Sequence, residues 1–156
     1  MSALQHYPRI TPFLWFDSNA EEAVEFYLSV FKNSRRLDPV RPSVDGGAPK
    51  GKPLTVAFEL DGQTFTALNG GPLFQFTEAV SFLVRCDSQQ EVDYYWSKLS
   101  AGGSESRCGW LKDKFGLSWQ IVPEQLPDLI KQPKAMEAML RMGKLDIAEL
   151  ERAAQP

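Results

Sequence analysis

An internal repeat constrains the fold more than any other feature of this sequence. Four apolar positions with the i, i+3, i+4, i+7 spacing of one helix face occur twice, 69 residues apart. They are Ala23, Phe26, Tyr27 and Val30 in the first copy, and Val92, Tyr95, Trp96 and Leu99 in the second. The same offset carries Phe13-Leu14 onto Phe82-Leu83. We therefore expect two similar modules that pack together.

Each copy begins with a strand and continues with a helix. The first strand covers 9–16, and the second covers 79–86. Each helix is preceded by an S-x-x-E box that predicts a capped N-terminus. The boxes are Ser18 with Glu21 and Ser88 with Glu91. Because these boxes are offset by 70 residues, a one-residue slip is expected in the turn before the helix.

A strand meander follows each helix. Asp61-Gly62 joins two strands in the first copy, and KDKFG joins two in the second, with Asp113 predicted to be solvated. Residues 34–41 are a further strand candidate. Residues 38–54 are predicted to form a long Pro- and Gly-rich loop, which is either a mobile lid or a connection without function. The predicted fold class is α+β, with two tandem βαβββ modules and C-terminal short helices. The modules, 9–72 and 79–123, and the helical tail, 124–156, are expected to form a single domain over 1–156.

Bulk properties exclude several classes of function. The net charge of −3 does not provide the basic face that nucleic-acid binding requires. The absence of a signal peptide and of an 18-residue apolar run predicts a cytoplasmic protein without a membrane span. Cys86 and Cys108 are expected to be reduced thiols, or a redox pair if they lie close together. The composition includes a single histidine, His6, which argues against a histidine-based zinc site and against a catalytic triad with a histidine base.

Three segments resemble a known family. They are FLWFDSNAEEAVEFYLSVF, AVSFLVRCDSQQEVDYYWSKLS and CGWLKDKFGLSWQIVP. They are similar to the glyoxalase/bleomycin-resistance/dioxygenase superfamily, also called vicinal oxygen chelate proteins, and to its branch labelled 3-demethylubiquinone-9 3-methyltransferase, or PhnB-like. The resemblance implies two modules whose sheets curve around a concave pocket, and a homodimer.

The resemblance also implies where metal-using relatives hold their ion. Those positions correspond here to Pro12 (or Ile10 in another register), Thr66, Ser81 and Gln120. Only Gln120 is a plausible ligand, because divalent cations prefer several carboxylates or imidazoles. No cofactor is predicted, and an intrinsic divalent metal is disfavoured.

The methyltransferase label is not supported by the residues. Binding of S-adenosylmethionine usually uses a glycine-rich loop between a strand and a helix. The two strand-to-helix turns, FDSNAEE and CDSQQEV, contain no glycine.

Eight residues are candidates for a site. Gln120, Thr66 and Ser81 form either a hydrogen-bonding floor for a ligand or a satisfied internal cluster. Trp110, Phe16 and Phe65 are pocket walls or core, and Asn69 lines the pocket mouth or turns the chain. Cys108 is a catalytic thiol or a small buried residue on a strand. These candidates are Gln120, Thr66, Ser81, Trp110, Phe16, Phe65, Asn69 and Cys108.

Three functions follow from these observations. The first is a small-molecule-binding protein without its own metal. The second is an enzyme of lyase, isomerase or oxygenase type that uses Cys108 or an imported divalent metal. The third is a dimeric interaction module that works through its C-terminal helices.

Overall fold

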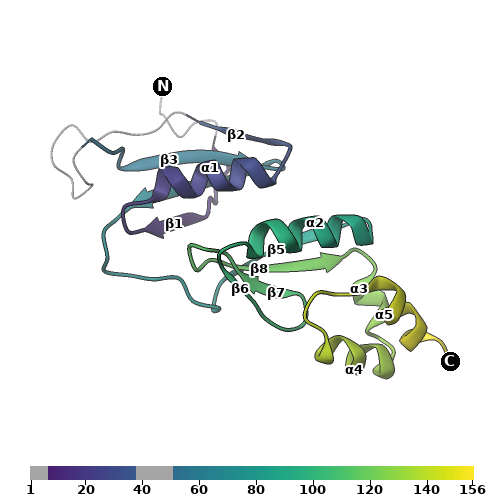
Figure 1. Cartoon of the computed structure of the whole chain (residues 1–156). Coiled ribbons are helices and arrows are strands. Elements are labelled where there is room, and N and C mark those ends of the chain that lie inside the picture. The colour runs from purple at the N-terminus through teal and green to yellow at the C-terminus, as the bar shows by residue number, and fades with distance from the viewer. Residues whose placement is uncertain (1–6, 38–50) are drawn as a thin grey trace. The chain divides into compact units, whose positions relative to one another are not determined.

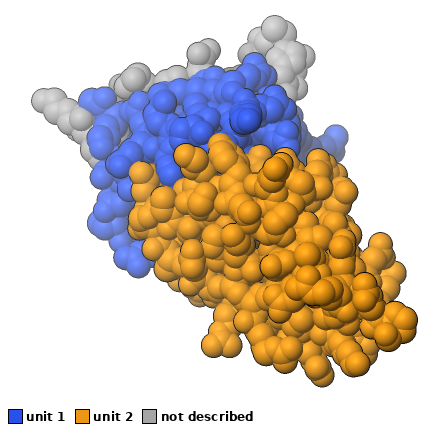
Figure 2. Space-filling model, turned by 45° about the vertical axis from the view of Figure 1, so that its right-hand side comes forward, with its two compact units in different colours: residues 1–75 blue, residues 76–156 orange. Residues whose placement is uncertain are grey.

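The structure, a computed structural model, describes residues 7–37 and 51–156. His6 and the greater part of the predicted loop 38–54 lie outside the described residues. The chain divides into two compact units, residues 1–75 and 76–156 (Figure 2). Within the described ranges, no helix has the length and apolarity needed to cross a membrane.

The first unit is one helix on a four-stranded sheet (Figure 1). Its strand order is β1-β4-β3-β2, in which β1 runs parallel to β4 and the other pairs are antiparallel. The elements are β1 (Phe13–Phe16), α1 (Ala20–Val30), β2 (Ser34–Arg36), β3 (Thr55–Leu60) and β4 (Gln63–Asn69).

The second unit repeats this arrangement and adds a helical tail. Its strand order is β5-β8-β7-β6, with the same parallel and antiparallel pairings. The elements are β5 (Ser81–Cys86), α2 (Gln89–Ser100), β6 (Ser104–Glu105), β7 (Trp110–Lys112), β8 (Ser118–Pro123), α3 (Leu126–Leu129), α4 (Pro133–Arg141) and α5 (Ile147–Ala154). The predicted α+β fold of two tandem modules with short C-terminal helices is confirmed.

Apolar packing attaches each helix to one face of its sheet. Tyr27 of α1 stacks on Phe58 at a centroid distance of 6.1 Å, and Phe58 stacks on Phe65 at 5.3 Å. In the second unit, Val92, Trp96 and Leu99 of α2 are buried at the predicted positions. Burial of these side chains is the main stabilising term for each unit.

The two helices begin differently. Ser88 caps α2 as predicted, because its side chain accepts a hydrogen bond from the Glu91 N–H. The predicted Ser18 cap is wrong: α1 begins after Asn19, which makes no side-chain cap bond. The Ala20 N–H instead donates to Asn69 Oδ1 at 2.9 Å, so β4 supplies the acceptor.

The strands align 70 residues apart, which differs by one from the predicted offset. Phe13 pairs with Thr66, and Leu83 pairs with Gln120, and the two apolar side chains are similarly exposed. The equivalent of Phe13 is therefore Leu83, whereas the buried helix positions keep the offset of 69. The first unit thus has one additional residue between strand and helix, which displaces Ser18 from the capping position.

The turn between β7 and β8 is organised around a buried carboxylate. Asp113 is 2% exposed, so the prediction that its carboxylate is solvated is wrong, whereas Lys114 in the same turn is exposed. Its Oδ1 accepts hydrogen bonds from the N–H groups of Phe115 and Leu117, and its Oδ2 accepts one from Trp119 Nε1 at 2.9 Å. This carboxylate therefore satisfies three donors and positions the β8 tryptophan.

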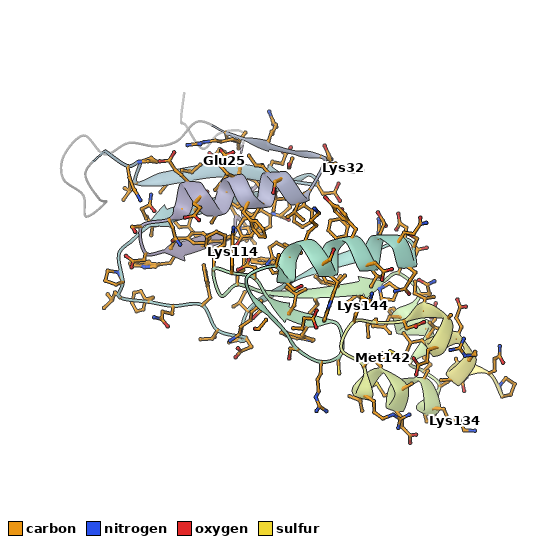
Figure 3. The ribbon with its side chains drawn as sticks, in the orientation of Figure 1. Glu25, Lys32, Lys114, Lys134, Met142 and Lys144 are labelled. Carbon is orange, nitrogen blue, oxygen red and sulfur yellow. The ribbon has the colours of Figure 1, made fainter. Side chains whose placement is uncertain are left out.

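The tail packs on the second unit through a separate apolar cluster. Val122, Leu126, Met139, Leu145 and Leu150 belong to this cluster, with Cys108 packed against it. The segment between α4 and α5, which includes Met142 and Lys144 (Figure 3), is bonded to the turn before β7. There the N–H of Cys108 donates to the Met142 carbonyl.

Gln89 at the start of α2 holds the tail through both ends of its amide. Its Nε2 donates to the Leu145 carbonyl at 3.0 Å, and its Oε1 accepts from the Ile147 N–H at 2.8 Å. The second bond satisfies an N-terminal amide of α5.

We predict that Asp113→Ala lowers the free energy of unfolding by about 3 kcal/mol, because three buried donors lose a charged acceptor. Asp113→Asn retains one oxygen but faces the Trp119 N–H with a donor, so its expected loss is about 1–2 kcal/mol. Urea denaturation followed by tryptophan fluorescence measures both. The exposed Asp128→Ala is the control, with an expected change below about 0.5 kcal/mol. Equal stability of Asp113→Ala and wild type would contradict this role.

We predict that Gln89→Ala loosens the tail without unfolding the sheet. The loss of two hydrogen bonds is expected to reduce the local stability of α5 by about 1–2 kcal/mol. Hydrogen exchange of the Ile147 amide measures this change. The neighbouring Gln90 is exposed, so Gln90→Ala is the matched control and should leave that amide unchanged. Equal protection of the Ile147 amide in the two variants would show that the Gln89 side chain does not hold the tail in place.

Candidate ligand-binding face

Each sheet has one face that its helix does not cover. Because neighbouring residues of a strand point to opposite faces, Trp119 and Ile121 face α2, and Gln120 faces away from it. Residues that pair directly across strands lie on the same face of a sheet. The partners of Gln120 and Ser118 on β5 and β7 therefore also face away from α2. We call this set the second open face; its residues are Ser81, Leu83, Trp110, Lys112, Ser118 and Gln120.

The second open face brings together three of the predicted site residues. Gln120 pairs with Trp110 on β7, and its Nε2 donates to Ser81 Oγ on β5 at 2.9 Å. Gln120, Trp110 and Ser81 are each half-buried. This bond is the internal polar contact predicted for Gln120, and it fixes the direction of the amide.

An apolar surface lies beside this polar contact. Leu83, the partner of Gln120 on β5, is 57% exposed. Trp110 flanks Gln120 on the other strand. An amide and a hydroxyl between apolar side chains are the features by which proteins usually orient small ligands.

The ends of this face are bounded differently. Val122 follows Gln120 on the same side of β8 and packs into the apolar cluster of the tail. At the other end, the Lys112 ammonium forms an ion pair with the Glu78 carboxylate. A hydrogen bond from Lys112 lowers the pKa of Glu78, which keeps the carboxylate ionised.

The corresponding face of the first unit carries Thr66. It pairs with Phe13, which is 60% exposed, whereas Thr66 itself is buried. Trp15 lies two residues along on the same side of β1. Its Nε1 donates to the Gly71 carbonyl at 2.9 Å, and its ring makes a T-shaped contact with the Phe74 ring. Gly70 is needed beneath this indole, because a Cβ there would lie 2.4 Å from Trp15 Cε2.

Three other predicted site residues lie on the opposite side of the first sheet. Phe16 and Phe65 are buried in the core covered by α1. Asn69 is fully buried, donates to the Pro53 carbonyl and accepts from the Ala20 N–H. The structure therefore gives these residues structural contacts and does not place them beside Thr66.

The two cysteines are free thiols in different surroundings. Cys86 is buried, and burial together with Glu91 and Asp87 raises its pKa to about 12. Cys108 is half-buried at the apolar cluster of the tail. It lies in a turn with φ of 60°, so the expectation of a residue on a strand is wrong. Gly109, also left-handed, follows it and lets the chain enter β7.

The projected metal positions do not fit a divalent cation. They offer one amide, with its nitrogen committed to Ser81, and two hydroxyls. Divalent cations in proteins are held by several carboxylates or imidazoles, and neither residue type is in this set. Across 7–37 and 51–156, no three His, Cys, Asp or Glu side chains gather as a metal cluster.

Comparison with known proteins assigns the chain to a family. The sequence profile described as 3-demethylubiquinone-9 3-methyltransferase matches residues 8–122. The chain belongs to this family. No match was found among curated proteins.

Solved structures agree with this assignment. The PhnB protein from Bacillus cereus is 34% identical with a TM-score of 0.68, and the match covers 74% of this chain and 99% of that one. Protein PA1353 from Pseudomonas aeruginosa is 21% identical with a TM-score of 0.61, covering 75% and 98%. The fosfomycin resistance protein FosX from Mesorhizobium loti is 12% identical with a TM-score of 0.55, covering 80% and 98%. These similarities confirm the glyoxalase-like fold.

Sequence reasoning missed two residues on the side of the second sheet that α2 does not cover. Leu83 and Ser118 share a side with Gln120, so correct strand alternation would have found both. The Lys112 contact with Glu78 carries no such signal, because Glu78 lies outside the strands.

We predict that Cys86 is unreactive in the folded protein. Because its pKa is raised to about 12, the thiol stays protonated in mildly alkaline buffer, and its thiolate forms only as the pH approaches that value. In a Cys108→Ser variant, the alkylation of Cys86 should be about a thousandfold slower in the folded protein than in the same protein unfolded in guanidinium chloride. Maleimide labelling followed by mass spectrometry measures this ratio. Rapid labelling of the folded variant would contradict the burial of Cys86.

Proposed function

We propose that the protein binds a small organic molecule on the second open face, without a metal held by its own side chains. The observation that carries this proposal is the Gln120–Ser81 hydrogen bond between Trp110 and the exposed Leu83. Directional polar groups next to uncovered apolar surface are typical of ligand sites. The poor donor set supports a role that does not depend on an intrinsic metal.

Thr66 supports an extension of the proposal to the first unit. It occupies the position equivalent to Gln120 in the repeated fold, and the exposed Phe13 is the counterpart of Leu83. Phe16, Phe65 and Asn69 would then act indirectly, by holding β1 and β4 in register.

Homodimer formation is part of the proposal. Large apolar side chains, among them Leu73, Phe74 and Val80, are more than half exposed in the single chain. Exposed apolar groups that gather in one short segment favour a protein contact. A cytoplasmic location remains our expectation from the sequence.

A second candidate function is an interaction module that works through the tail. A groove of about 550 Å³ lies over α4 and α5 and is lined by charged side chains, among them Lys134, Arg141 and Arg152. Met136 and Leu140 of α4 are also exposed. Catalysis by Cys108 receives less support, because its side chain packs against the apolar cluster of the tail.

Methyl transfer, the activity in the family's description, is not our proposal. In the first unit the residues between β1 and α1 are Asp17, Ser18 and Asn19, and in the second Asp87 and Ser88 follow β5. Neither turn offers the glycine-rich backbone that commonly binds the cofactor of such enzymes.

We predict that Gln120→Leu abolishes a ligand-induced rise in melting temperature. A thermal-shift screen of neutral and anionic aromatic fragments identifies the ligand, and titration calorimetry then compares the variants. Loss of an oriented amide should weaken binding about tenfold or more. Gln90→Leu, on the exposed side of α2, is the control and should bind like wild type. If Gln120→Leu leaves the fragment-induced rise in melting temperature unchanged, the binding site does not include Gln120. If a chelator abolishes that rise, the result favours the alternative of an enzyme that uses an imported divalent metal.

A further inference from the structure

An ion pair crosses one end of the second open face. Lys112 lies on β7 opposite Ser118 of β8, and its ammonium pairs with Glu78 in the segment before β5. Since β5 and β7 lie on the two sides of β8, this ion pair links β7 to the segment that leads into the strand on the far side of β8. Lys112, one member of this ion pair, is the cross-strand neighbour of Ser118.

The hydroxyl of Ser118 is buried and has no partner. The residue is 1% exposed, and within the described part of the chain only Ser118 Oγ and Gln125 Oε1 are buried side-chain atoms without a hydrogen bond. A buried hydroxyl without a partner is unfavourable and often indicates a missing interaction. Ser118 lies between Ser81 and Lys112, so a hydroxyl donor and an ammonium point to the same end of the face.

Among the residues that the structure describes, Glu78 is the one carboxylate paired with Lys112, and it is exchangeable. The Glu78 side chain is 60% exposed and that of Lys112 is 39% exposed. Exposed ion pairs contribute little to stability, so replacement of one carboxylate by another costs little. Glu78 also lies outside the helices and strands, so it can move without breaking the sheet.

We infer that the second open face takes a small carboxylate with an apolar or aromatic body. The ligand carboxylate replaces Glu78 on Lys112 and accepts a hydrogen bond from Ser118 Oγ as Glu78 withdraws. The body of the ligand lies on Leu83 and Trp110, beside the amide of Gln120. This inference rests on the proposed function and specifies the chemical class of its ligand.

The first unit provides an internal contrast. The counterparts of Ser118 and Lys112 are Thr64 and Glu59, which pair with each other across β4 and β3. Glu59 forms an ion pair with Arg35 at 3.3 Å. A carboxylate at this position repels an anionic ligand, so the preference for a carboxylate belongs to the second unit alone.

Titration calorimetry with benzoate and its neutral analogue benzamide tests the inference on the full-length protein. Glu78→Gln removes the competing carboxylate and should tighten benzoate binding about two- to fivefold. Lys112→Met should weaken benzoate binding at least about tenfold, and Lys112→Arg should restore part of it. Lys98→Met, an exposed site on α2, controls for net charge and should have no effect. Benzamide binding should not respond to any of these changes.

The outcomes separate the inference from the proposed function. Benzoate binding that is unchanged in a folded Lys112→Met variant overturns the carboxylate assignment. The proposed function still stands after that result if benzamide binding is weakened by Gln120→Leu. Absence of binding by both probes also overturns the assignment, and the fragment screen then decides the proposed function independently. Circular dichroism of Lys112→Met establishes that the variant is folded.

Discussion

The packing of one helix against one face of a four-stranded sheet is the contact on which each unit depends. Strand residues alternate between faces, so burial of Phe58 and Phe65 under α1 requires Thr66 to point the other way. The same constraint under α2 turns Gln120 away from Trp119 and Ile121. A slip of one residue would exchange the two sets and expose the core. The side chains available for binding are therefore fixed by the packing on the opposite face.

Much of this arrangement could be predicted because it depends on local patterns. The helix periodicity, the Ser88 cap and the Asp61-Gly62 turn are short-range signals, and both residues of that turn have positive φ. Gln120 with Ser81 could also be predicted, since the family register brings those strands together. The strand offset was wrong by one residue because Phe82 and Leu83 are both apolar, and composition does not show which of them faces α2.

The remaining features could not be predicted because each joins residues that are distant in the chain or changes the environment of a polar group. Asn69 caps a helix that begins 49 residues earlier, and no local pattern indicates that pair. Asp113 lies between two lysines and resembles a solvated turn residue, yet the Trp119 indole and two backbone donors enclose it. The sequence predicts a strand that includes Cys108. Gly109 and the hydrogen bonds to the tail instead place Cys108 in a left-handed turn.

The two halves of the repeat share their cores more closely than their open faces. Helix burial is preserved at Tyr27 and Trp96, because any loss there would separate helix from sheet. The residues of the open faces do not pack against α1 or α2, and one equivalent position holds Glu59 in one unit and Lys112 in the other. Ala57 similarly corresponds to Trp110. A duplicated fold that retains its core can therefore acquire a different ligand preference on each sheet, because charge and shape on the uncovered side change without altering the packing beneath.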